Sequence, residues 1–141
     1  MVDEGSLDAV LAEHVWEHLT PTEGEVAAVH CFRFLRPGGY VRAAVPDGLH
    51  PSAEYRQWVR PSGVGPGADD HKVLYNDRTF GALFERAGFS VELLEYFDEQ
   101  GRLHEQPWDP ALGMIHRSSR FDDRNRGGTL AYTSLVLDAR K

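Results

Sequence analysis

Residues 9–45 contain the pattern that most limits how this chain can fold. A short apolar run of strand length, Ala9–Ala12, is followed by a predicted helix and then by a second strand, Tyr40–Val45. The turn Arg36–Gly39 ends the helix, because proline cannot continue the hydrogen-bond ladder and glycine accepts a left-handed conformation. Strand, helix and strand in this order form a βαβ unit with two parallel strands. The sequence therefore predicts an α/β domain.

The helix of this unit has a clear start. Residues 20–23, Thr-Pro-Thr-Glu, have the form of a capping box, with a threonine oxygen for the free backbone amides and glutamate three residues later. Proline occupies the first helical position, where its missing N–H costs nothing. Apolar residues then follow at helical spacing: Val26, Val29, Phe32 and Leu35.

The second half of the chain predicts one more helix and two more strands. Asn76-Asp77 caps a helix that carries an apolar stripe. Gly88-Phe89 ends this helix in the manner of a Schellman motif. Strands are predicted at Ser90–Phe97 and, at the end of the chain, at Thr129–Ala139.

Two long segments show no clear periodicity of apolar residues. Residues 49–75 predict a loop or lid with a short helical turn at Ala53–Val59, since loops of this length in compact domains often bind ligands. Residues 98–128 predict an irregular polar insertion, in which Arg102–Glu105 pairs back as a hairpin arm. Both belong to a single domain over residues 1–141, because this length is too short for two ordinary domains.

Composition argues against several kinds of partner. The net charge of -7 disfavours a nucleic-acid partner, because phosphate binding needs a basic face. Cys31 is the only cysteine, so no internal disulfide forms and a reducing compartment fits. Neither a signal peptide nor an apolar run of membrane-spanning length is evident. We therefore expect a cytoplasmic protein that binds neither nucleic acid nor membrane.

The charged residues after the first strand admit two interpretations. In the first, the strand delivers Glu13 and His14 to its carboxyl end, where open α/β sheets bind ligands, and Asp47 faces the same crevice from the neighbouring strand. In the second, His14, Glu17 and His18 form H-x-x-E-H, a zinc hydrolase pattern with two histidines one helical turn apart. We favour the first, which assigns no metal ligand, because the strand places His14 at its end rather than inside a helix.

Three motifs together resemble a known family. Ser6–Leu19, Phe34–Tyr40 leading into Val45-Pro46-Asp47, and Phe84–Phe89 are similar to the later half of class I S-adenosylmethionine (SAM)-dependent methyltransferases. The similarity is closest to a predicted, poorly characterised branch with Glu-His-Val-x-Glu-His-Leu and Val-Pro-Asp. It implies a partial Rossmann-like sheet of about four strands flanked by helices. In that sheet the first strand here corresponds to the family's fourth, and the others to its fifth, sixth and antiparallel seventh.

The resemblance also implies site residues. Carried over by position, Ala12, Glu13 and His14 border the methionine end of SAM, while Pro46 and Asp47 border the substrate. The family's glycine-rich turn and ribose-binding acid precede the position where this chain starts. We therefore expect a truncated methyltransferase-like protein without the usual cofactor loop.

Residue chemistry adds candidate roles for a small-molecule substrate. His14 or His71 would remove a proton, with Asp47 beside it, since a histidine paired with a carboxylate serves as a general base. Methyl transfer then depends mainly on alignment of nucleophile and methyl donor. Candidate substrate contacts are Pro46, Tyr55, Trp58, Arg117 and Arg120.

The first strand is expected to form an edge of the sheet. An exposed apolar edge invites pairing. We therefore expect a homodimer, or a partner chain, along residues 9–12. A non-catalytic scaffold or interaction module remains an alternative, because a fold alone does not prove chemistry.

Overall fold

The computed structural model describes the whole chain and contains one five-stranded sheet with the order β1-β2-β5-β3-β4. β1 (Leu7–Glu13) and β2 (Leu35–Val45) are parallel neighbours. β5 (Leu135–Arg140) runs antiparallel between β2 and β3 (Ser90–Phe97), and β4 (Leu103–Glu105) pairs back on β3. The predicted α/β sheet, its parallel pair, its antiparallel last strand and the hairpin arm are confirmed.

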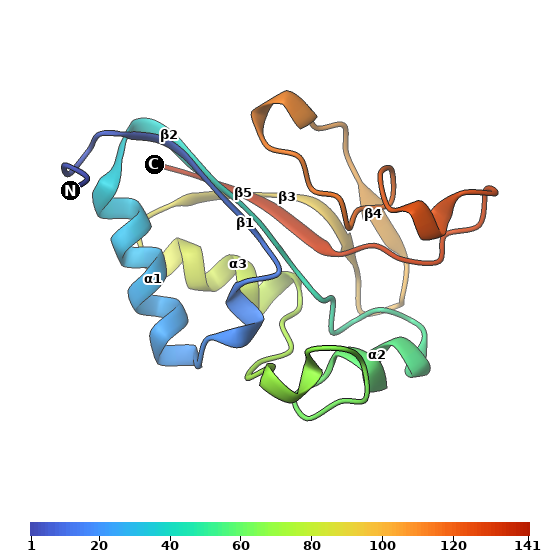
Figure 1. Ribbon diagram of the computed structural model, residues 1–141. Coiled ribbons are helices and arrows are strands. Elements are labelled where there is room, and N and C mark those ends of the chain that lie inside the picture. Colours follow the sequence, from blue (N-terminus) through green and yellow to red (C-terminus); the bar gives the residue numbers. More distant parts are fainter.

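Two helices cover one face of this sheet, as Figure 1 shows. They are α1 (Pro21–Phe34) and α3 (Asp77–Arg86), while the short α2 (Ala53–Val59) lies beyond the strand ends. The predicted capping box of α1 is present, because the Thr20 amide donates to Glu23 Oε2 at 2.9 Å and the Glu23 amide donates to Thr20 Oγ1 at 3.3 Å. No helix is both long and apolar enough to cross a membrane.

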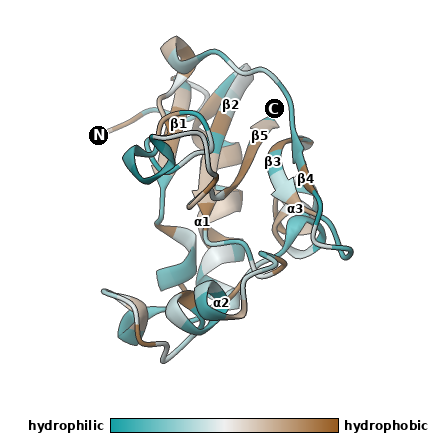
Figure 2. Ribbon diagram, turned by 90° about the vertical axis from the view of Figure 1, so that its right-hand side faces the viewer, coloured by the Kyte–Doolittle hydropathy of each residue, from teal (hydrophilic) through white to brown (hydrophobic).

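The helix-covered face holds the main apolar core. Alternate residues of β2 and β5 point to it, so that Val41 and Leu137, for example, are fully buried there. Hydrophobic residues gather along both strands in Figure 2. On the helix side the rings of Trp16 and Phe84 pack with centroids 5.2 Å apart, and Phe80 packs edge-on against Phe84 at 5.3 Å.

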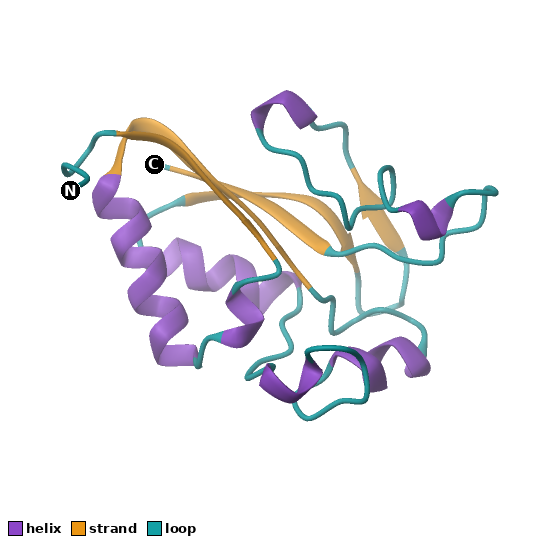
Figure 3. Cartoon of the chain, viewed as in Figure 1, coloured by secondary structure: helices purple, strands orange, loops and turns teal.

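The opposite face is covered by the segment between β4 and β5, which is mostly loop (Figure 3). Arg42 on β2 and Asp138 on β5 form a buried two-bond ion pair there, with Nε–Oδ1 at 2.8 Å and Nη2–Oδ2 at 2.9 Å. Arg42 Nη1 also donates to the carbonyls of Asp109 and Gly113. These hydrogen bonds attach the loop segment to the sheet.

A second buried carboxylate holds the same segment. Glu95 on β3 accepts hydrogen bonds from Trp108 Nε1 at 2.9 Å, the Ser119 amide at 2.8 Å and Thr133 Oγ1 at 2.6 Å. All four residues pack on the loop-covered face. The polar insertion predicted from the sequence is therefore ordered by polar contacts with the sheet.

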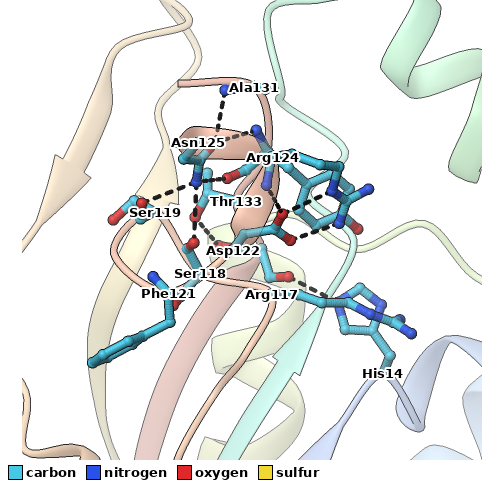
Figure 4. Close-up of polar contacts among 12 residues, drawn as sticks. His14, Arg117, Ser118, Ser119, Phe121, Asp122, Arg124, Asn125, Ala131 and Thr133 are labelled. Carbon is cyan, nitrogen blue, oxygen red and sulfur yellow. Dashed lines mark hydrogen bonds and ion pairs between the residues drawn. The ribbon is translucent and has the colours of Figure 1, made fainter. Parts of the chain in front are cut away.

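The last strand is shorter than predicted, because it begins at Leu135 rather than at Thr129. The amides of Ala131 and Tyr132 donate to Asn125 Oδ1 at 2.7 Å and 2.8 Å instead of to a neighbouring strand. Asn125 Nδ2 in turn donates to the Tyr132 carbonyl at 2.7 Å (Figure 4). One side chain thus replaces strand pairing over these residues.

Candidate functional site

A cavity of about 490 Å³ lies at the carboxyl ends of β1 and β2. Its wall comes from the residues after each strand, from the segment that contains α2, and from the loop segment before β5. Open α/β sheets bind their ligands at this edge. The lining residues are Glu13, His14, Glu17, His18, Pro46, Trp58, Val59, Gly65, Pro66, Gly67, His71, Arg117, Arg124 and Tyr132.

His14 has an unusual backbone conformation at the end of β1. Its φ is +55°, a left-handed conformation that is uncommon for residues other than glycine, and its amide donates to the Ala44 carbonyl at 2.8 Å. This conformation is accompanied by contacts at both ring nitrogens. Nε2 lies 2.8 Å from Ser134 Oγ and Nδ1 lies 3.1 Å from Glu17 Oε1. Such backbone strain is often found at functional sites.

Glu17 is a buried carboxylate without hydrogen-bond donors. Its side chain is 1% exposed, and neither oxygen accepts a hydrogen bond. His14 and His18 lie near Oε1 only at ion-pair distances of 3.1 Å and 3.9 Å. Burial of an unsatisfied charge is costly, so this carboxylate is suited to a cationic partner.

The predicted H-x-x-E-H zinc motif is not formed. Only a single 3₁₀ turn, Trp16–His18, follows the strand, and His14 lies before it in the left-handed conformation. His14 and His18 are therefore not one α-helical turn apart on a helix face, as the motif requires. The zinc hydrolase alternative with this ligand set is wrong.

Two arginines from the loop segment before β5, Arg117 and Arg124, also line the cavity. The Arg117 amide donates to Glu13 Oε1 at 2.7 Å, which ties the loop segment to β1. Arg124 binds Asp122 through two hydrogen bonds of 2.8 Å and 2.6 Å, and its guanidinium lies 3.7 Å from the centroid of the Tyr132 ring (Figure 4). The hydrogen bonds to Asp122 raise the pKa of Arg124. The cavity thus brings acidic residues at the end of β1 together with arginines of the loop segment.

Six of the predicted site residues lie in the cavity wall, and four lie elsewhere. Ala12 belongs to the apolar core, and Arg120 stacks on Phe121 away from the cavity. The six that the structure brings together are Glu13, His14, Pro46, Trp58, His71 and Arg117.

Asp47 and Tyr55, the other two, have structural contacts. Asp47 is fully buried, and its carboxylate accepts hydrogen bonds from the amides of Phe97 at 2.8 Å and Leu49 at 2.9 Å. Burial raises the pKa of Asp47 to about 6. Tyr55 accepts a hydrogen bond from the Asp47 amide, and burial raises its pKa well above the usual value. Asp47 thus joins the ends of β2 and β3 and does not face the cavity.

The favoured interpretation of the sequence missed four lining residues with polar side chains. A sequence signal existed for Glu17 and His18, because both belong to the charged run after β1. Only the zinc alternative used these two residues, so the favoured interpretation left them out. No sequence signal pointed to Arg124 and Tyr132, because they come from a segment without hydrophobic periodicity.

Comparisons with known proteins identify the fold. Residues 1–43 match a family model described as a methyltransferase domain, and no curated protein matches the sequence. Three solved structures illustrate the similarity. A SAM-dependent methyltransferase of Archaeoglobus fulgidus has a TM-score of 0.55 at 19% identity, over 98% of this chain and 61% of its own.

The second is a SAM-dependent methyltransferase of Thermotoga maritima, described as a possible histamine N-methyltransferase, with a TM-score of 0.59 at 16% identity over 99% of this chain and 58% of its own. The third is the complex of a Haloferax volcanii methyltransferase with its Trm112 activator. It has a TM-score of 0.53 at 17% identity, over 98% of this chain and 55% of its own. The chain thus has the class I SAM-dependent methyltransferase fold, and it spans about three fifths of these structures.

Proposed function

We propose that this chain provides the strand-end site of a SAM-dependent methyltransferase that acts on a small molecule. The observation that carries the proposal is the cavity at the carboxyl ends of β1 and β2, in a fold shared with SAM-dependent methyltransferases. Its volume of about 490 Å³ falls in the range of small-molecule sites.

The donor set of the cavity fits the methionine end of SAM. That end carries a sulfonium cation, for which the Glu13 carboxylate is a suitable partner, and a carboxylate, for which the Arg117 guanidinium is suitable. The half-exposed ring of Trp58 offers a face for the cation. When bound, SAM supplies the methyl group. We assign no residue to its adenosine, because the glycines at 65 and 67 follow a helix rather than a strand.

Two histidines are candidates for removing the substrate proton. His14 is held by Glu17 on one side and Ser134 on the other, so its ring orientation is fixed. His71 donates from Nδ1 to the Val59 carbonyl at 2.6 Å, which leaves Nε2 with a free lone pair. His71 Nε2 would act as a general base on a hydroxyl or amine, whereas His14 would first have to release one of its two ring-nitrogen contacts.

Calorimetric titration of SAM against the full chain tests this proposal. We expect micromolar binding that Glu13→Gln weakens by about 10-fold, because a charged partner of the cofactor is lost. Glu92→Gln is the matched control, since Glu92 is an exposed carboxylate on β3 outside the cavity. An absence of binding heat with SAM at 1 mM contradicts the proposal and favours the non-catalytic scaffold.

We also propose that a second copy, or a partner chain, covers the edge strand β1. β1 has a neighbour only on its β2 side. Leu11 on β1 is 51% exposed, and Val26 and Val29 on one face of α1 are 49% and 51% exposed. A stable monomer at micromolar concentration in analytical ultracentrifugation would contradict a homodimer. A cytoplasmic location belongs to the same proposal, and cell fractionation tests it.

A further inference from the structure

Three side chains in the cavity wall form a cluster that the proposed methyl transfer does not require as a unit. Glu17, His18 and His71 each offer one ligand atom, and these atoms all lie within 4.8 Å of one another. The rings of His18 and His71 meet edge to face with centroids 4.8 Å apart. Two imidazoles and one carboxylate are a common ligand set for transition metals.

The buried Glu17 carboxylate gives independent evidence for a bound cation. Its side chain is 1% exposed and no donor is aligned with either oxygen. His14 contacts Oε1 at 3.1 Å, and Oε2 has no partner at all. Because a buried carboxylate with an unsatisfied oxygen is costly, a cation in this position would remove the penalty.

The histidines are held in a way that suits metal ligands. His71 Nδ1 donates to the Val59 carbonyl at 2.6 Å, so in the neutral ring the lone pair lies on Nε2. His18 Nδ1 lies 3.3 Å from Asp70 Oδ2, at ion-pair rather than hydrogen-bond geometry, and its Nε2 lies 3.9 Å from Glu17 Oε1. Metal-binding histidines usually have such an oxygen behind the nitrogen that does not coordinate.

The backbone explains why residues far apart in the sequence meet here. The Lys72 amide donates to the Glu17 carbonyl at 2.6 Å, so the segment after η2 (Ala68–Asp70) is fastened to the turn that follows β1. This hydrogen bond places His71 next to Glu17 and His18. The His18 side chain is 33% exposed and is therefore able to adjust.

We propose that Glu17, His18 and His71 bind one Zn²⁺ ion, with the fourth position open to the cavity. Tetrahedral zinc with bonds of about 2.0 Å holds its ligand atoms about 3.3 Å apart. Glu17 Oε1 and His18 Nε2 lie 3.9 Å apart, and a rotation of the partly exposed His18 side chain would close this gap. This ligand set differs from H-x-x-E-H, since His71 takes the place of His14. The open position would take a water or an oxygen atom of a substrate. A zinc ion bound to His71 Nε2 would exclude the use of this nitrogen as a general base.

The test uses the full chain without a polyhistidine tag, stripped with a chelator. We expect one equivalent of Zn²⁺ to bind at about 1 μM or tighter, measured by competition with a chromophoric chelator. Co²⁺ bound at the same site should give the visible absorption of a tetrahedral complex. His18→Ala and His71→Ala should each weaken binding by more than about 100-fold.

Two further variants sharpen the assignment. His30→Ala removes an exposed histidine on α1 and should leave the zinc affinity unchanged. Asp70→Asn should weaken it by about 10-fold, because Asp70 supports His18 from behind. Where a histidine variant fails to fold by circular dichroism, Glu17→Gln replaces it. A failure to bind Zn²⁺, or binding that survives loss of His18 or His71, overturns the proposal, and neither result bears on SAM binding.

Discussion

The two faces of the sheet are stabilised in different ways. On the helix-covered face, β2 and β5 pack apolar side chains against α1 and α3, and the rings of Trp16, Phe80 and Phe84 fill the space between them. On the loop-covered face, the same two strands present Arg42 and Asp138, which bond to each other, and Arg42 also donates to two carbonyls of a segment with little secondary structure.

The difference shows how a long irregular segment is held in place. Apolar packing depends on area and shape and is not directional, whereas each buried polar group requires a particular partner. The position of the loop segment therefore depends on a few specific hydrogen bonds rather than on interchangeable contacts. Because this segment supplies Arg117, Arg124 and Tyr132 to the cavity, the polar face determines one wall of the site.

The largest effect is expected on the apolar face. Phe84→Ala should lower the free energy of unfolding by roughly 4 kcal/mol, because a fully buried ring is replaced by a cavity. Phe84→Leu, which leaves a smaller void, should lower it by less. Urea unfolding monitored by circular dichroism measures both. A loss below 1 kcal/mol for Phe84→Ala would show that this face is loosely packed.

The ion pair on the polar face should behave differently. Asp138→Leu alone should lower the free energy of unfolding by roughly 3 kcal/mol, because Arg42 is left as an uncompensated buried charge. The double variant Arg42→Met, Asp138→Leu should recover only part of this loss, because Arg42→Met also removes the hydrogen bonds to the carbonyls of Asp109 and Gly113. A larger loss in the double variant than in Asp138→Leu would mean that the unpaired charge of Arg42 is not the main cause. The same urea unfolding experiments measure the free energy of unfolding of the single and double variants.

Asp47 predicts the pH dependence of stability. Burial raises the pKa of Asp47 to about 6, from an unfolded value near 3.8. The folded state therefore holds this proton more tightly, and its stabilisation is complete below about pH 4 and lost as pH rises through 6. The shift corresponds to about 3 kcal/mol. The free energy of unfolding should therefore fall between pH 4 and 7 in the unsubstituted protein, and this part of the fall should be absent in Asp47→Asn. The same pH dependence in both proteins would contradict the role of Asp47.

The smallest effect is expected at Asn125. Its amide group bonds the carbonyls of Ser118, Ser119 and Tyr132 and the amides of Ala131 and Tyr132. Asn125→Ala should lower the free energy of unfolding by about 1–2 kcal/mol and speed hydrogen exchange at residues 131 and 132. Asn125→Asp retains the acceptor and should protect those two amides. Identical exchange in both variants would show that the side chain does not hold this segment.

The two faces also differ in how far the sequence predicts them. The βαβ unit and α3 follow from local signals, such as the capping box at Thr20, the turn at 36–39 and the stripe that contains Phe84. Arg42 and Asp138, in contrast, are 96 residues apart, and no periodicity connects them. The same holds for the site. Glu13 and His14 were predicted from the strand end, whereas the approach of Arg124 depends on contacts that no local pattern encodes.

NMR titration of the ¹⁵N-labelled chain with SAM tests whether the strand-end cavity binds the methyl donor. We predict saturable amide shifts at His14, Glu17 and Arg117, which line the cavity, and none at His30 on the outer surface of α1. Unchanged spectra with SAM at 1 mM, or shifts confined to residues outside the cavity, would contradict the assignment of this strand-end site to the methyl donor.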